Sequence, residues 1–349
     1  MNKKKSEREL LVERLDKELI ARGAQAPDAE KFNFPDKEGT PERNAMVGEV
    51  KELYKAPPSL DKELAHINTW DLSRILIFNT RSETDYTRGI GDWDERLDWY
   101  EIPDEQILQN CKCVAAVCTK DNLTDLKNGF FSLKTKLYGE TFNLCDSEPF
   151  YDQPVSVGYM CCGVLVAEDV ITTAYHNANR NNIEDFRFIF GYWMSGPGEP
   201  VLCFPAANIY RGIKIIHHEI GENRDGWALI KLDRKVQGQT IARISNQEIF
   251  CDQPLYVIGH PVGLPLKYSS GASVSHITSE TYFMASLNIY MGNSGSPVFD
   301  LDTHEVIGMV LQGVPRDFRW TGKNWISVIY PEGRSAACTR ISGIIPFIR

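Results

Sequence analysis

The stretch Met291–Val298 reads MGNSGSPV and places Ser294 between two glycines on a tight turn. An apolar run beginning at Pro297 follows this turn. Glycine tolerates backbone conformations that other residues avoid, so flanking glycines can bring two backbone N–H groups round to one point. Such a pair, expected here from Gly292 and Ser294, can stabilise a negatively charged oxygen. The stretch predicts a nucleophilic serine beside an oxyanion hole, and a Gly- and Ser-rich hairpin turn is the alternative interpretation.

A histidine ends a pair of apolar runs upstream of this turn. Residues 164–173 form a hairpin-like pattern, and His176 follows them. A histidine at a strand end can present its imidazole to a serine from another part of the fold and act as a general base. Most single histidines are structural or exposed, so His176 carries weight only together with Ser294.

An acidic residue lies between the histidine and the serine. Asp225 leads into the apolar run 226–232. The order His176, Asp225, Ser294 is one of the orders in which a catalytic triad occurs. A buried carboxylate there would hold the imidazole tautomer and stabilise the imidazolium.

The pattern of apolar and polar residues after about residue 104 indicates strands. Short apolar runs rich in β-branched and aromatic residues recur, broken by Gly, Asn, Asp and Pro, which predicts a mainly antiparallel β protein, either a sandwich or a barrel. The clearest runs are residues 113–118, 163–173, 186–192, 227–232, 255–259, 306–312 and 326–330.

Three of these stretches carry a family resemblance. Residues 173–176, 225–232 and 292–297 resemble the histidine, aspartate and serine motifs of trypsin-like serine peptidases of the chymotrypsin superfamily, particularly the bacterial branch that includes glutamyl endopeptidases. The resemblance implies two packed antiparallel β-barrels with the site in the cleft between them. The peptidase domain would span 92–349, with a first barrel at about 105–240 and a second at about 245–340. Residues 145–154, 259–267 and 338–342 are also similar to segments of this branch.

The sequence departs from the family pattern at three positions. The family's aspartate position is Gly226 here, so a one-residue bulge is needed to bring Asp225 into register. Asn293 occupies the place of the aspartate that pairs with the new amino terminus in trypsin activation, and it has no charge to pair. Asn177 follows His176 where secreted trypsins have a disulfide-bonded cysteine, so that disulfide cannot form in the usual way.

The expected substrate pocket also differs from the charged pockets of the family. Asn288 replaces the aspartate by which trypsins select Arg or Lys, and residues 309–311 lack the histidine that glutamyl endopeptidases use. A charged substrate side chain in the S1 pocket would therefore lack a counter-charge, and we expect a preference for an uncharged residue. The expected pocket walls are Asn288, Ile289, Tyr290, Leu311, Gln312 and Gly313.

The composition and net charge limit which classes of partner the protein can have. A net charge of -9 argues against nucleic acid, since phosphate binding draws on a basic surface. No apolar stretch reaches the length of a membrane span, and no signal peptide is recognised, so we expect a cytoplasmic protein unless a leader was removed. The nine cysteines match no common zinc pattern, and we expect mostly buried, reduced thiols, with no metal and no cofactor.

The first 91 residues have no counterpart in the family. The spacing of leucines in residues 6–22 predicts an amphipathic helix, and residues 23–58 look like a linker or a loosely packed arm. We interpret 1–91 as a helical or irregular extension that packs on the surface or docks a regulatory partner.

Three functions compete on the sequence alone. The first is a serine endopeptidase that cleaves protein or peptide substrates through an acyl-enzyme on Ser294, with His176 as general base and Asp225 as orienting acid. The second is a catalytically inactive, protease-like binding module, suggested by the shifted acid. The third is an esterase or acyl transferase of another fold, whose serine motif would read Gly-x-Ser-x-Gly before a helix. Ser294 does not fit that spacing.

Overall fold

The computed structural model describes residues 7–21, 94–146, 148–179, 182–220, 226–313, 317–320, 323–328 and 336–348. The helix expected near residues 6–22 is confirmed as α1 (Glu7–Ala21). The rest of the extension, including the expected linker, lies outside the described residues. No described helix has the length and the apolar character that crossing a membrane requires.

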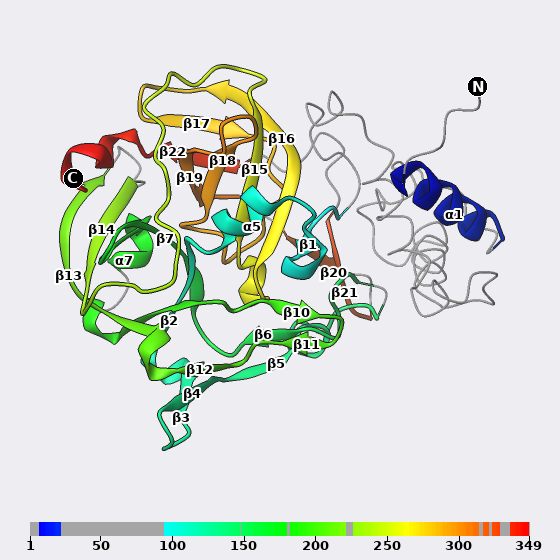
Figure 1. Cartoon of the computed structure of the whole chain (residues 1–349), viewed down its shortest axis with the longest axis horizontal. Helices are drawn as coiled ribbons and strands as arrows, with labels where there is room; N and C mark the ends of the chain where they lie inside the picture. The colour runs from blue at the N-terminus through cyan, green and yellow to red at the C-terminus, as the bar shows by residue number, and fades with distance from the viewer. Residues whose placement is uncertain are drawn as a thin grey trace.

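Six antiparallel strands close the first barrel (Figure 1). Apolar and β-branched residues alternate between the barrel interior and its outer contacts, and Phe188 and Ile230 lie fully buried inside. In barrel order the strands are β13 (Ile209–Ile220), β14 (Gly226–Leu232), β8 (Val170–Ala174), β7 (Met160–Ala167), β2 (Val114–Thr119) and β9 (Phe186–Phe190).

Six further strands close the second barrel, because β16 pairs with both β15 and β17. A short strand, β1 (Leu97–Asp98), extends this sheet at β16. The two closed barrels confirm the mainly β, two-barrel architecture of the chymotrypsin type. In order the barrel strands are β16 (Lys267–Ile277), β15 (Pro254–Gly259), β18 (Pro297–Asp300), β19 (Val306–Gln312), β22 (Ala336–Arg340) and β17 (Tyr282–Ala285).

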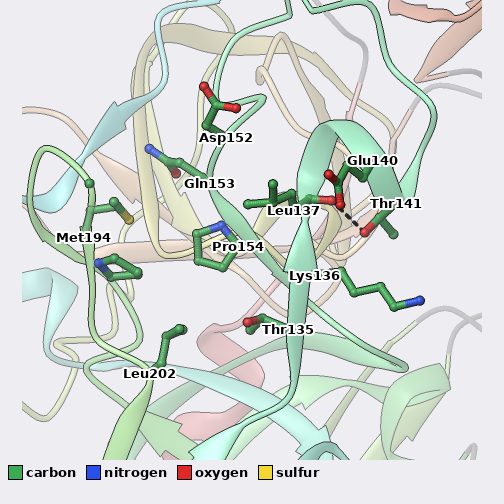
Figure 2. A pocket seen from close by; sticks show the side chains of 12 residues that line it. Thr135, Lys136, Leu137, Glu140, Thr141, Asp152, Gln153, Pro154, Met194 and Leu202 are labelled. Atoms are coloured by element: carbon green, nitrogen blue, oxygen red, sulfur yellow. Dashed lines mark hydrogen bonds between the residues drawn. The ribbon is translucent and has the colours of Figure 1, made fainter.

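Short hairpins and helices decorate the barrels. A hollow of about 860 Å³ lies between the β5–β6 and β10–β11 hairpins, and Lys136, Gln153 and Met194 are among its lining residues (Figure 2). None of the expected catalytic or pocket residues lines it. The decorating elements are β3 (Leu123–Asp125), β4 (Phe130–Leu133), β5 (Thr135–Leu137), β6 (Pro154–Ser156), β10 (Met194–Gly196), β11 (Glu199–Pro200), β12 (Cys203–Pro205), β20 (Phe318–Trp320), β21 (Trp325–Ser327), α5 (Glu105–Cys111), α6 (Tyr138–Thr141) and α7 (Tyr175–Ala178).

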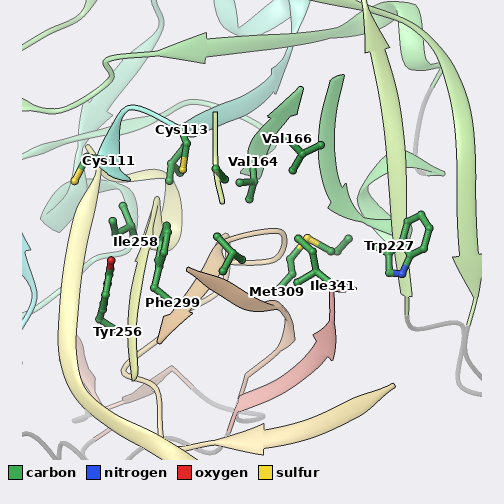
Figure 3. Packing of buried hydrophobic residues seen from close by; sticks show 14 of the residues in the cluster. Cys111, Cys113, Val164, Val166, Trp227, Tyr256, Ile258, Phe299, Met309 and Ile341 are labelled. Atoms are coloured by element: carbon green, nitrogen blue, oxygen red, sulfur yellow. The ribbon is translucent and has the colours of Figure 1, made fainter. Parts of the chain in front are cut away.

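One hydrophobic cluster joins the barrels. Val164 and Trp227 of the first barrel belong to the same buried cluster as Tyr256, Phe299 and Met309 of the second (Figure 3). Burying apolar side chains from both barrels removes a continuous apolar surface from water. The two barrels are therefore packed as one body. This packing holds the loops where the barrels meet in fixed positions.

Candidate active site

The serine turn has two positions that only glycine fits. Gly292 has φ +95°, and Gly295 has φ +89°. A Cβ added at Gly295 would lie 2.0 Å from the carbonyl oxygen of Cys162 and 2.5 Å from Thr173 Oγ1. Left-handed backbone and close approach both exclude a side chain. The turn before β18 is therefore seated directly against β7 and β8 of the other barrel.

Ser294 is anchored from three sides. Its carbonyl oxygen accepts hydrogen bonds from the Cys162 amide at 3.0 Å and from Asn177 Nδ2 at 3.0 Å. Its hydroxyl donates to the carbonyl oxygen of Leu311 at 3.1 Å. The main chain of Ser294 is thus fixed between the two barrels, while its hydroxyl must turn from Leu311 before it can donate to an imidazole.

The two amides expected to form the oxyanion hole have no hydrogen-bond acceptor among the described residues. In the same turn, the Asn293 amide donates to the Tyr290 carbonyl at 3.1 Å and the Gly295 amide donates to the Val310 carbonyl at 2.8 Å. The amides of Gly292 and Ser294 donate to no described group. Gly292 and Ser294 are half-buried, and backbone N–H groups shielded from water are almost always paired, so two unpaired donors on one turn are suited to an external acceptor.

His176 lies on α7, the short helix that directly follows β8, and its side chain is exposed. The next residue, Asn177, is 3% exposed and contacts the serine turn directly. Besides its bond to Ser294, Asn177 Nδ2 donates to Thr173 Oγ1 at 3.1 Å, and Asn177 Oδ1 accepts from the Tyr159 hydroxyl at 2.7 Å. His176 and Ser294 therefore stand on segments that one buried amide side chain ties together.

Asp225 lies just outside the described residues, so its role stays a prediction. The strand that follows it, β14, begins at Gly226, and Trp227 pairs with Ala174 at the end of β8. The described start of β14 is therefore beside the segment that leads into His176.

The expected pocket residues lie on two neighbouring segments. Asn288, Ile289 and Tyr290 are buried before the serine turn, and Leu311 is buried near the end of β19. Gln312 is exposed, and Gly313 is half-buried. A Cβ built on Gly313 would lie 3.2 Å from Ile289 Cδ1, so the two segments are in van der Waals contact.

Sequence reasoning missed a buried cation beside this region. The Arg96 guanidinium lies 4.1 Å from the centre of the Tyr290 ring. Arg96 is far from the serine motif along the chain, and no spacing rule connects the two. The one available signal is a lone arginine in the polar stretch that precedes Leu97.

Asn293 is buried, and its Oδ1 accepts from the Ser296 hydroxyl at 3.2 Å. The Asn293 side chain is therefore satisfied by a neutral hydrogen bond within the turn. How the protein is activated stays a prediction.

Most of the cysteine thiols are buried. All nine cysteines are unpaired with one another, and seven of them are buried. Burial raises the pKa of Cys162 to about 11, although the backbone amide of His260 donates to its sulfur at 3.1 Å. Cys162 is therefore a neutral thiol. No cluster of metal-ligating side chains occurs in the part of the chain that the structure describes.

Two buried titratable groups, Glu148 and His260, have opposite pKa shifts. Burial raises the pKa of Glu148 to about 7, against hydrogen bonds from the Ser327 hydroxyl and amide. Burial lowers the pKa of His260 to about 4, and its Nδ1 donates to the Leu264 carbonyl at 3.1 Å. Glu148 therefore favours the folded state most below pH 4.5 and loses this contribution as the pH rises to 7. His260 adds stability as the pH rises from 4 to 6.5.

Glu148→Gln tests this balance. The variant keeps the His260 contribution and removes that of Glu148, so its stability relative to the native protein should improve between pH 4 and pH 8 by about 3 kcal/mol. Urea unfolding at half-unit pH steps measures the difference. A difference that stays constant across this range would contradict the assigned pKa of Glu148.

The two closed barrels, with the serine turn between them, define a protein of the chymotrypsin-like fold. Within it, residues 161–309 match the family model described as a trypsin-like peptidase domain. This match contains His176 and Ser294. The finer expectation of a branch related to glutamyl endopeptidases remains a prediction.

Solved structures give distant matches. An inactivated protease paralogue of the scabies mite shares 14% identity at a TM-score of 0.41, over 69% of this chain and 93% of its own. A protease of M. tuberculosis H37Rv in its inactive form shares 10% identity at a TM-score of 0.40, over 70% of this chain and 90% of its own. No curated protein matches the chain.

Proposed function

We propose that this chain is a serine endopeptidase with Ser294 as nucleophile and His176 as general base. The observation that carries the proposal is the serine turn itself. Its Gly292 and Ser294 amides donate to no described group, and its backbone is tied to the His176 segment through Asn177. The match of residues 161–309 to a trypsin-like peptidase domain supports the same class of reaction.

In the proposed reaction, the Ser294 hydroxyl turns from the Leu311 carbonyl and loses its proton to His176 as Oγ attacks the substrate carbonyl carbon. The amides of Gly292 and Ser294 bind the resulting oxyanion. The imidazolium then protonates the leaving amine as the C–N bond breaks. In deacylation, His176 takes a proton from water as the water attacks the acyl-enzyme carbonyl, and the imidazolium then gives this proton to the leaving Ser294 Oγ. Asp225 orients the imidazole.

Labelling with a fluorophosphonate probe tests the nucleophile. The native protein should form one covalent adduct, located on Ser294 by mass spectrometry, and Ser294→Ala should form none. Ser279→Ala, an exposed serine between β16 and β17, is the matched control and should label as the native protein does. A native protein that does not label would contradict the proposal.

One observation favours an alternative, a protease-like binding module without activity. The Ser294 hydroxyl donates to the Leu311 carbonyl, which is not the arrangement of a nucleophile in contact with its base. In that case the hydroxyl stays on Leu311 and the probe does not react. The labelling experiment therefore separates the two functions.

We also propose that the S1 pocket prefers an uncharged residue. Asn288 supplies no charge, and the buried Arg96 beside Tyr290 is already paired with Asp94. A charged side chain would be desolvated without a counter-charge. A peptide-library profile should show cleavage after uncharged residues, and Asn288→Asp should increase cleavage after Arg or Lys by at least about tenfold. Rapid native cleavage after Arg or Glu would refute the assignment.

A further inference from the structure

A buried arginine, Arg96, lies against the ring of Tyr290, just before the serine turn, and the proposed reaction does not use it. Arg96 is 1% exposed. It directly precedes β1, whose Leu97 pairs with Tyr268 of β16. This pairing attaches the backbone next to Arg96 to the second barrel. The starting point and direction of the Arg96 side chain are therefore fixed.

Asp94 and two aromatic rings hold the guanidinium. Arg96 Nε donates to Asp94 Oδ1 at 2.7 Å, and Nη2 donates to Asp94 Oδ2. The guanidinium lies 4.1 Å from the ring centre of Tyr290 and 5.0 Å from that of Phe150. A two-pronged carboxylate contact fixes the plane of a guanidinium, and aromatic faces attract it. The Arg96 guanidinium therefore has a defined orientation, and the carboxylate of Asp94 neutralises its charge.

Burial of this ion pair is costly for the fold. The side chains of Arg96 and Asp94 are 1% and 8% exposed. Their neighbour Tyr138 is fully buried, and its hydroxyl has no hydrogen-bond partner among the described residues. Apolar side chains of similar volume often stabilise such a position as well or better. Fold stability alone therefore does not explain why a charged pair is buried here. Holding the Tyr290 ring in one position is a more specific explanation.

Tyr290 begins the loop that supplies the oxyanion amides. Its carbonyl accepts from the Asn293 amide at 3.1 Å, and the Met291 carbonyl accepts from the Val262 amide at 2.5 Å. The Met291 amide donates to Asp317 Oδ2 at 2.8 Å. Each contact fixes a backbone group within two residues of Gly292. A displaced Tyr290 ring would move the first of these anchors and, with it, the Gly292 amide.

We propose that Arg96 is a positioning residue that orders the 290–293 loop through Tyr290, so that the Gly292 and Ser294 amides point to one oxyanion. This role rests on the proposed peptidase function. Arg96 contacts no reacting atom; it acts by holding an aromatic side chain whose backbone belongs to the oxyanion loop.

Arg96→Lys tests the proposal while keeping the positive charge. Lysine cannot reproduce the planar fork or its stacking. The control is Arg234→Lys, because Arg234 is also an arginine between a carboxylate and an aromatic ring: its Nη1 donates to both oxygens of Asp233, and its guanidinium lies 4.3 Å from the Tyr210 ring centre in the first barrel. Arg96→Lys should label at Ser294 at least about tenfold more slowly, with kcat lowered and KM unchanged for a small ester. Arg234→Lys should leave both unchanged.

Amide hydrogen exchange gives a second measurement that needs no activity. Peptides covering residues 286–296 should exchange faster in Arg96→Lys than in the native protein or Arg234→Lys, while peptides of β13 and β14 should not differ between Arg96→Lys and the native protein. If Arg96→Lys does not fold, Tyr290→Leu removes the stacked ring and keeps the ion pair, with the same expected change. Unchanged exchange and labelling in a folded variant would overturn the proposal.

These two measurements separate this proposal from the function on which it rests. A native protein that does not label at Ser294 contradicts the peptidase function. The exchange difference between Arg96→Lys and Arg234→Lys then still decides whether Arg96 orders the loop.

Discussion

Replacing His176 with alanine should lower kcat/KM for a cleavable peptide by about 10⁴- to 10⁶-fold, with the fold intact. The reason is that His176 is the expected general base, and the next residue, Asn177, ties its helix α7 to Ser294. Without the imidazole, the Ser294 proton has no acceptor during attack, and the leaving amine has no donor. Steady-state kinetics on one peptide, with circular dichroism for the fold, measure the effect.

His276→Ala is the control for the loss of an exposed histidine. His276 lies on β16, is also exposed and belongs to no part of the proposed site. It should retain native kinetics. Equal activities of the native protein and His176→Ala would remove His176 from the mechanism, even if Ser294 labels. A smaller loss shared by both histidine variants would indicate an effect on the fold.

The sequence predicts the strands well because their signals are local. The apolar runs at 113–118, 186–192 and 306–312 became β2, β9 and β19, with ends shifted by at most two residues. The run at 163–173 became β7 and β8, which its hairpin-like pattern had indicated. Alternation of apolar and polar residues is a property of the segment itself. The closure of each barrel came only from the family resemblance, since periodicity does not distinguish a barrel from a sandwich.

The site is predicted less completely, because its geometry depends on contacts between distant segments. The motifs indicated Ser294 and His176 and the amides around the turn. They gave no sign that the Ser294 hydroxyl would donate to Leu311, which depends on one side-chain rotamer. Arg96 was missed for a related reason: its importance arises from the ring of Tyr290, which only the folded chain brings within 4.1 Å.

Gly295→Ala should lower the free energy of unfolding by more than about 4 kcal/mol, or the variant should fail to fold. Alanine at φ +89° pays the cost of a left-handed backbone, about 1–2 kcal/mol. Its Cβ would also lie 2.0 Å from the Cys162 carbonyl oxygen, which is main chain of β7 and cannot rotate aside. The turn must therefore leave the first barrel, and its bonds from Cys162 and Asn177 would break.

Gly129→Ala measures the backbone part of this cost alone, so its difference from Gly295→Ala gives the steric part. Gly129 has φ +81°, nearly the same backbone conformation, but nothing lies within 4 Å of its added Cβ. Denaturant unfolding should show a loss of about 1–2 kcal/mol for this control and a much larger loss for Gly295→Ala. If the two variants lose equally, the serine turn is not held against β7 as described. Its two unbonded amides would then be free to move, and a moving pair of donors stabilises an oxyanion poorly because the substrate must first order them.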